Sequence, residues 1–157
     1  MRLLKQGGYK TINIKQLVEA IKGNITNIPK RPIVITFDDG HDSFEQIGVP
    51  ILQKYGFSAT MFVITSKVGE TGYLSIEGIR ELTNEGMFFE SHSRYHSILT
   101  KLSRSEQEME IINSKSELEE ITNSPVSIFS YRGGHYDDSI QSIVKEAGYI
   151  SAVCSMQ

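Results

Sequence analysis

The chain has 157 residues, of which 39% are hydrophobic and 22% charged, so it is large enough for one ordinary core and too apolar to be disordered. Its formal net charge of −3 argues against nucleic acid as a partner, because nucleic-acid binding depends on a basic surface. No apolar run approaches the ~20 residues of a membrane span, and residues 1–6 lack the apolar core of a signal peptide, so the localisation stays open.

The first elements that we expect are a helix and a strand. Residues 14–23 carry apolar side chains at helical spacing and end at a glycine, which predicts a helix. The β-branched, apolar run 32–37 predicts a buried strand. A helix over residues 43–55 follows, with Pro50 as a kink or a late start.

The rest of the chain continues to alternate strands with helices. Ser75 is expected to cap one helix, and Ser103 with Glu106 has the spacing of a capping box that opens a long helix. These patterns predict helices over residues 75–85, 103–122 and 140–147, and strands at residues 59–64, 87–90, 127–131 and 149–153. Cys154, the single cysteine, cannot form an internal disulfide, and we expect it to be buried near the end of the last strand.

Strands that alternate with helices at this spacing pair in parallel, with right-handed crossovers. Five such units make either an open sheet or most of a barrel, and the periodicity does not choose between them. We expect a single α/β domain over residues 1–157.

Two adjacent aspartates, Asp38 and Asp39, come directly after the first strand of this sheet, and Gly40 lets the backbone turn sharply. Active sites of parallel α/β folds gather where the strands end at their carboxyl side. Two neighbouring carboxylates repel each other unless a cation or a shared proton relieves them. The pair could instead cap the next helix, but its position favours chemistry.

Two histidines, His92 and His96, follow the third strand of the sheet. On a helical turn this spacing puts both imidazoles on one face, where they can share a metal ion. Two imidazoles and one carboxylate make a divalent site for zinc or iron(II). A lone HxxxH is a weak signal, so the prediction depends on its lying at the same sheet edge as the aspartate pair. His41 and His135 also follow strands and could line the pocket.

The segments that carry these residues resemble two signatures of the NodB-like polysaccharide deacetylases, carbohydrate esterase family four. Residues 36–40, TFDDG, are similar to the first signature, and residues 92–96, HSRYH, fit the HSxxH metal motif. Weaker similarity covers nearly the whole chain, including residues 8–12, 51–62 and 147–149.

The resemblance implies a parallel, distorted (β/α)7 barrel and a metal-dependent hydrolase. Asp39, His92 and His96 would hold a divalent metal, zinc by default and otherwise cobalt or nickel, and Asp38 would be the general base. The substrate would be a polysaccharide or oligosaccharide that contains N-acetylglucosamine, and the reaction would remove its N-acetyl groups and release acetate.

A third motif departs from the family pattern. Residues 129–134 align with an FxYPYG stretch, so that Arg132 replaces the proline and Gly133 the tyrosine. In another frame, Arg132 is the arginine that in some members pairs with the base aspartate. Gly133 can still offer its N–H to an oxyanion, and His135 is a further candidate for the substrate wall.

The family's Leu-His motif, whose histidine is the general acid, does not occur before Gln157. The resemblance therefore implies a barrel that is incomplete at its C-terminal end, with an open fifth strand through which the chain could self-associate. Loss of a general acid typically lowers the rate by ~10²–10⁴-fold. The alternative to an active deacetylase is an impaired member that binds metal or sugar without efficient turnover.

Two other classes of protein fit the sequence less well. A phosphoacceptor receiver domain also has five βα units and an early acidic pair. It needs an aspartate after its third strand and a lysine after its fifth, and this sequence has neither there. Iron(II) oxygenases use the same metal triad, but usually on antiparallel folds.

Overall fold

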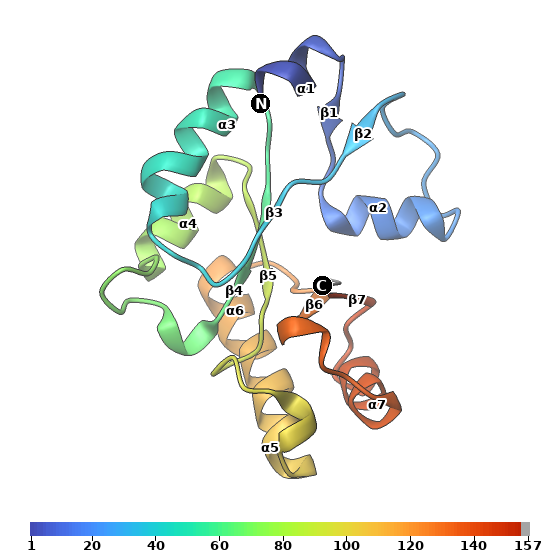
Figure 1. Cartoon of the computed structure of the whole chain (residues 1–157), viewed down its shortest axis with the longest axis vertical. Coiled ribbons are helices and arrows are strands. Elements are labelled where there is room, and N and C mark those ends of the chain that lie inside the picture. The colour runs from blue at the N-terminus through green and yellow to red at the C-terminus, as the bar shows by residue number, and fades with distance from the viewer. Residues whose placement is uncertain (155–157) are drawn as a thin grey trace.

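The computed structural model of the protein describes residues 1–154. Five parallel strands form one sheet in the order of the sequence: β3 (Thr36–Phe37), β4 (Thr60–Val63), β5 (Phe88–Ser91), β6 (Ile128–Tyr131) and β7 (Ser151–Cys154). The sheet forms half of a barrel, with helices on its outer side (Figure 1). The expected parallel α/β fold is confirmed. Of the two arrangements that the periodicity left open, the structure shows part of a barrel.

The helices between the strands begin near the residues that the sequence indicated. They are α3 (Val49–Tyr55), α4 (Ile76–Asn84), α5 (Arg104–Glu108), α6 (Ser114–Thr122) and α7 (Asp138–Glu146). Ser75 caps α4 by accepting the N–H of Gly78, and the capping box of Ser103 and Glu106 opens α5. Wider π-helical turns, η1 (Phe44–Gly48) and η4 (Met109–Asn113), lead into α3 and α6.

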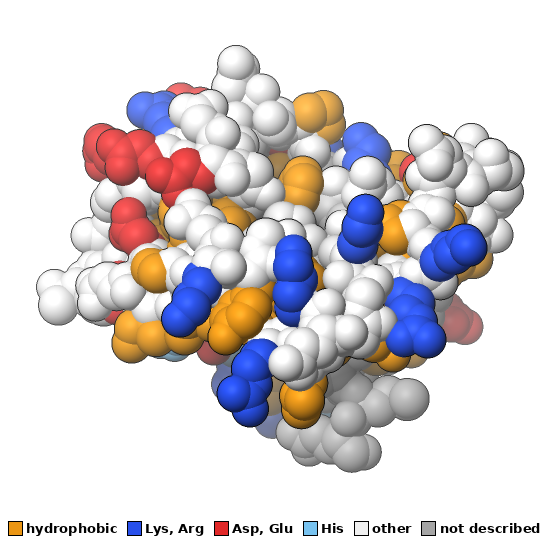
Figure 2. Space-filling view, turned by 90° about the horizontal axis from the view of Figure 1, so that it is seen from above, with side chains coloured by type: hydrophobic (Ala, Val, Ile, Leu, Met, Phe, Trp, Pro, Cys, Tyr) orange, Lys and Arg blue, Asp and Glu red, His pale blue; other side chains and the backbone are white. Residues whose placement is uncertain are grey.

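The N-terminal part adds elements that were not all expected. It contains α1 (Arg2–Gln6), β1 (Lys10–Thr11), α2 (Ile14–Ile21) and β2 (Pro32–Ile33). The single strand predicted over residues 32–37 is wrong, because β2 pairs with β1 whereas β3 pairs with β4. The chain thus leaves one sheet and enters the other within six residues. Lys and Arg side chains gather at this end of the molecule (Figure 2).

The two faces of the curved sheet bury different side chains, because successive residues of a strand point to opposite sides. Met61 and Phe129 pack into the large core under the outer helices. Their neighbours Phe62 and Ile128 point into the half-barrel, where Ile14 of α2 covers them. Helix α2 therefore closes part of the concave face.

Strand β7 lies at the edge of the described sheet, where it pairs only with β6. Cys154 at its end is exposed, so the expected burial of this cysteine is wrong. An edge strand leaves part of its backbone and side chains uncovered. Self-association through this edge stays a prediction. Among the described residues, no helix has the length and apolarity to cross a membrane.

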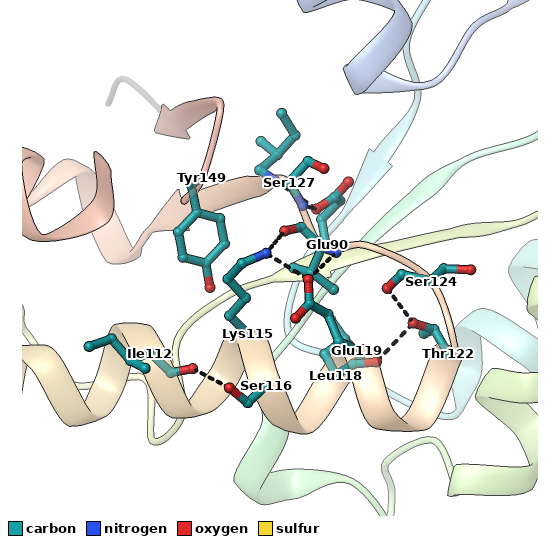
Figure 3. A network of polar contacts seen from close by, with 12 residues as sticks. Glu90, Ile112, Lys115, Ser116, Leu118, Glu119, Thr122, Ser124, Ser127 and Tyr149 are labelled. Carbon is teal, nitrogen blue, oxygen red and sulfur yellow. Dashed lines mark hydrogen bonds and ion pairs between the residues drawn. The ribbon is translucent and has the colours of Figure 1, made fainter. Parts of the chain in front are cut away.

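A buried carboxylate joins β5 to β6, whose backbones pair in register only at Ser91 and Phe129. Glu90 Oε2 accepts the N–H groups of Ser127, at 2.7 Å, and Ile128, at 2.8 Å. Figure 3 shows Glu90 facing Ser127, beside Lys115. Burial raises the pKa of Glu90 to about 7, although the two N–H groups and the lysine oppose the rise. The carboxyl group therefore holds β5, the strand that leads to His92, against the start of β6.

The raised pKa of Glu90 predicts that the fold loses stability as the pH rises. The value of about 7 lies above the 4.5 of an unperturbed glutamate, so the contribution is complete below pH 4.5 and is lost through pH 7. The difference corresponds to roughly 3 kcal/mol in the free energy of unfolding. Glu90→Gln cannot ionise but keeps an acceptor oxygen, so its stability should change less between pH 4.5 and 8. Urea denaturation at several pH values measures this, and equal pH dependence in both proteins would contradict it.

Candidate metal centre

Three predicted ligand residues meet at the carboxyl ends of β3 and β5. Asp39, His92 and His96 each offer an atom that lies within 4.8 Å of the other two. The Nε2 atoms of both histidines are 3.7 Å from Oδ1 of Asp39. The imidazole ring centroids are 4.5 Å apart. The structure thus brings Asp39 together with two histidines that lie 53 and 57 residues further along the sequence.

The chemistry of this trio fits a divalent metal ion. Nitrogen and oxygen ligands at ~2.0–2.1 Å around a tetrahedral ion lie about 3.4 Å from one another, close to the observed 3.7 Å. His92 Nδ1 lies 2.9 Å from the carbonyl oxygen of Ser130, which leaves Nε2 toward Asp39. Burial lowers the pKa of His96, and His92 and Arg132 lower it further, against the opposing effect of Asp39. A neutral imidazole is the form that binds metal.

The loop that carries the two histidines is strained rather than helical. Ser93 and His96 in this loop have φ angles of 65° and 60°, in the left-handed region that residues other than glycine rarely adopt. Asp39, in the loop after β3, has a φ angle of 77° in the same region. The expected helical turn over residues 92–96 is therefore wrong. Instead, the N–H of His96 donates to Ser93 Oγ at 3.1 Å, and this tight turn brings the imidazoles together. Surrounding contacts must hold such a conformation in place.

One such contact comes from Glu110, which the sequence did not single out. This buried residue lies in η4, and its Oε2 accepts the N–H groups of Arg94, at 2.9 Å, and Tyr95, at 2.8 Å. Ser114, also buried, brings its Oγ within 2.8 Å of Ser91 Oγ. In the sequence Glu110 looks like one more acidic residue of an amphipathic helix. Only its hydrogen bonds to the backbone of Arg94 and Tyr95, after β5, identify it as a support of the histidine loop.

We predict that Glu110→Ala lowers metal affinity by about 10–100-fold, because the loop loses the acceptor for two N–H groups. Glu110→Gln keeps an oxygen at the same place and should retain most of the affinity. Calorimetric titration with zinc measures the effect, and circular dichroism reports whether the variants remain folded. Equal affinities in the wild type and the alanine variant would exclude this role for Glu110.

Asp38 lies beside the trio and borders two hollows. One, of about 470 Å³, is lined mainly by apolar side chains of β3, η1 and α3, and the other, of about 290 Å³, lies inside the half-barrel. Although the side chain reaches solvent, partial burial raises the pKa of Asp38; His92 opposes the rise and Asp39 adds to it. A carboxylate with a raised pKa at the mouth of a cavity is suited to accept a proton.

The remaining candidates lie around this centre at different distances. His41 Nε2 is 3.9 Å from Asp39 Oδ2. Arg132 Nη1 donates to the carbonyl oxygen of His96 at 2.6 Å, so it braces the histidine loop. Gly133 has a left-handed φ of 56°. His135 is exposed, and within residues 1–154 no hydrogen bond or ion pair joins its side chain to Asp38 or the trio.

Comparisons with known proteins agree with this geometry. Residues 26–152 match the family model described as polysaccharide deacetylase. The chain is 30% identical over 153 residues to a putative polysaccharide deacetylase, YxkH, of Bacillus subtilis, covering 95% of this chain and 53% of the relative. It is 30% identical over 162 residues to a poly-beta-1,6-N-acetyl-D-glucosamine N-deacetylase of Staphylococcus aureus, covering 94% and 55%.

A solved structure shares the fold. The Streptococcus pyogenes deacetylase PplD, in complex with acetate, superposes with a TM-score of 0.88 at 29% identity, covering 93% of this chain and 65% of that one. The chain spans about half the length of the curated relatives that it matches.

Proposed function

The chain belongs to the polysaccharide deacetylase family, and on this premise we propose that it removes N-acetyl groups from a glycan that contains N-acetylglucosamine. The observation that carries the proposal is the placement of Asp39, His92 and His96 around one point, with Asp38 at their side. The Staphylococcus aureus relative is named for an N-acetylglucosamine polymer, which supports this class of substrate.

We assign the trio as ligands of a divalent ion, with zinc as the first choice and cobalt or nickel as alternatives. When bound, such an ion would lower the pKa of a water molecule and polarise the acetamide carbonyl. The hydrogen bond between His92 and Ser130 would fix the orientation of the first imidazole, and the brace from Arg132 would hold the backbone of His96.

Asp38 is the proposed general base. It would take a proton from the attacking water as the water oxygen adds to the carbonyl carbon of the acetamide. The carbon–nitrogen bond then breaks, which releases acetate and leaves the sugar with a free amine once that nitrogen gains a proton. We propose that Asp38, after taking the proton of the water, returns a proton to that nitrogen.

The substrate wall would be formed by the short helix η5 (Arg132–Gly134), directly after β6. We propose that the backbone N–H of Gly133 faces the developing oxyanion, with Arg132 beside it and His135 at the outer end. The left-handed conformation of Gly133 supports this, because it turns the backbone in a way that residues with a Cβ adopt only with strain.

The test is acetate release from N-acetylglucosamine oligomers by protein that has been stripped of metal and then supplied with zinc, cobalt or nickel. We expect acetate only when metal is present, and loss of activity on adding a chelator. Metal binding without acetate release would instead favour an impaired member that binds without turnover. Failure to bind any of the three metals would contradict the site assignment.

A further inference from the structure

Positive and negative charges are segregated along this chain. Residues 1–37 contain seven Lys or Arg and one acidic residue, Glu19, whereas residues 38–157 contain nine Lys or Arg and eighteen Asp or Glu. The first part therefore has a formal charge of +6 and the second of −9, so the modest total of −3 hides a strongly basic segment.

Most basic side chains of this segment surround the N-terminal ends of the strands. Lys10 begins β1 and Arg31 immediately precedes β2. Lys5 Nζ lies 6.0 Å from the ring centroid of Phe57, shortly before β4. We define the basic face as these residues and their exposed neighbours: Arg2, Lys5, Lys10, Lys30, Arg31 and Lys54. Figure 2 shows Lys and Arg side chains spread across this end of the molecule.

The candidate metal centre lies at the other end of the half-barrel. Asp38 and His92 directly follow the C-terminal ends of parallel strands whose N-terminal ends point toward the basic face. Charges separated by more than about 8–10 Å of salt solution are largely screened from each other. Figure 2 also shows Asp and Glu side chains grouped at one side of this end, so the part that carries most of the Lys and Arg side chains is the part that can meet an anionic surface.

Exposed apolar side chains lie among the basic ones. Leu3, which is 77% exposed, lies on α1 between Arg2 and Lys5. Tyr9 is 38% exposed, and the guanidinium carbon of Arg31 lies 6.0 Å from its ring centroid. A soluble polyanion would contact only the charges and would leave Leu3 in water. An anionic bilayer offers both phosphate groups and an apolar boundary, so it matches both components of this face.

We propose that the basic face docks on a membrane surface rich in anionic phospholipid. Lys and Arg side chains meet the headgroup phosphates, and Leu3 and Tyr9 enter the boundary between headgroups and acyl chains. This orientation directs Asp38 and the trio away from the bilayer. The inference depends on the charge and shape of the N-terminal part alone, and it stands whether or not the deacetylase activity is found.

The test is sedimentation of the whole chain with vesicles of phosphatidylcholine alone and with phosphatidylglycerol added. We expect binding only to the anionic vesicles, weakening with salt. Lys10→Gln with Lys30→Gln should lower that binding by about 25-fold, at about fivefold for each charge. The matched control is Lys67→Gln with Lys101→Gln, which removes the same charge after the C-terminal ends of β4 and β5 and should change binding little.

A second variant separates a bilayer from a soluble polyanion. Leu3→Ser keeps every charge, so it should weaken vesicle binding several-fold without changing binding to polyphosphate. Polyphosphate binding as strong as vesicle binding, with no effect of Leu3→Ser on either, would overturn the membrane in favour of a soluble polyanion. Equal losses in the two lysine pairs, or no binding to anionic vesicles, would overturn the proposed face.

Discussion

Replacing Asp38 by asparagine is expected to lower the rate of acetate release by about 10²–10⁴-fold while metal affinity stays near that of the wild type. Asparagine keeps the size of the side chain but cannot accept the proton. Asp38 also lies outside the trio whose donor atoms converge. Acetate release at saturating metal, together with calorimetric titration of zinc, measures the two properties separately.

The neighbouring aspartate supplies the matched control. Asp39→Asn removes charge from a proposed ligand, so its metal affinity should fall, whereas that of Asp38→Asn should not. The two variants differ by one position in the chain and remove the same charge. If Asp38→Asn released acetate at the wild-type rate, another group would have to be the base. If both variants lost metal equally, Asp38 would belong to the ligands.

The second large effect is expected from His92→Ala. His92 is only 5% exposed, and its loss leaves Asp39 and His96 as the two donors of the trio. We expect metal affinity to fall by more than the ~10–100-fold typical of a supporting residue, and acetate release to fall with it. Zinc titration and the acetate assay, read on the same preparation, establish whether the two losses go together.

His41 offers a control of the same residue type in the same region. It lies 3.9 Å from Asp39 but is outside the trio, and it stacks on Tyr73. His41→Ala should therefore keep its metal affinity. Because His92→Ala also frees the carbonyl oxygen of Ser130, a thermal melt of each variant is needed. A folded His92→Ala protein that still binds zinc normally would contradict the assignment.

Several features of the fold and the candidate site could be predicted from residues close together in the chain. The caps of α4 and α5, at Ser75 and Ser103, depend on groups three residues away, and they are confirmed. The alternation of strands and helices predicted the parallel sheet, which is also confirmed. Parallel strands end at a common edge, so the meeting of Asp39 with His92 followed from the motifs and the fold class.

Tertiary structure decided what depends on residues far apart in the chain. It divided residues 32–37 between two sheets and exposed Cys154 at an edge, because pairing partners rather than propensity set where a strand ends. It held the histidine loop in a left-handed turn against Glu110. Local pattern reports which residues favour helix or strand and which side chains suit a metal. The positive charge of residues 1–37 can be counted in the sequence, but the pairing of β1 with β2 is what brings Lys10 beside Arg31. The supports of the site arise only when distant segments pack, so no periodicity in the sequence records them.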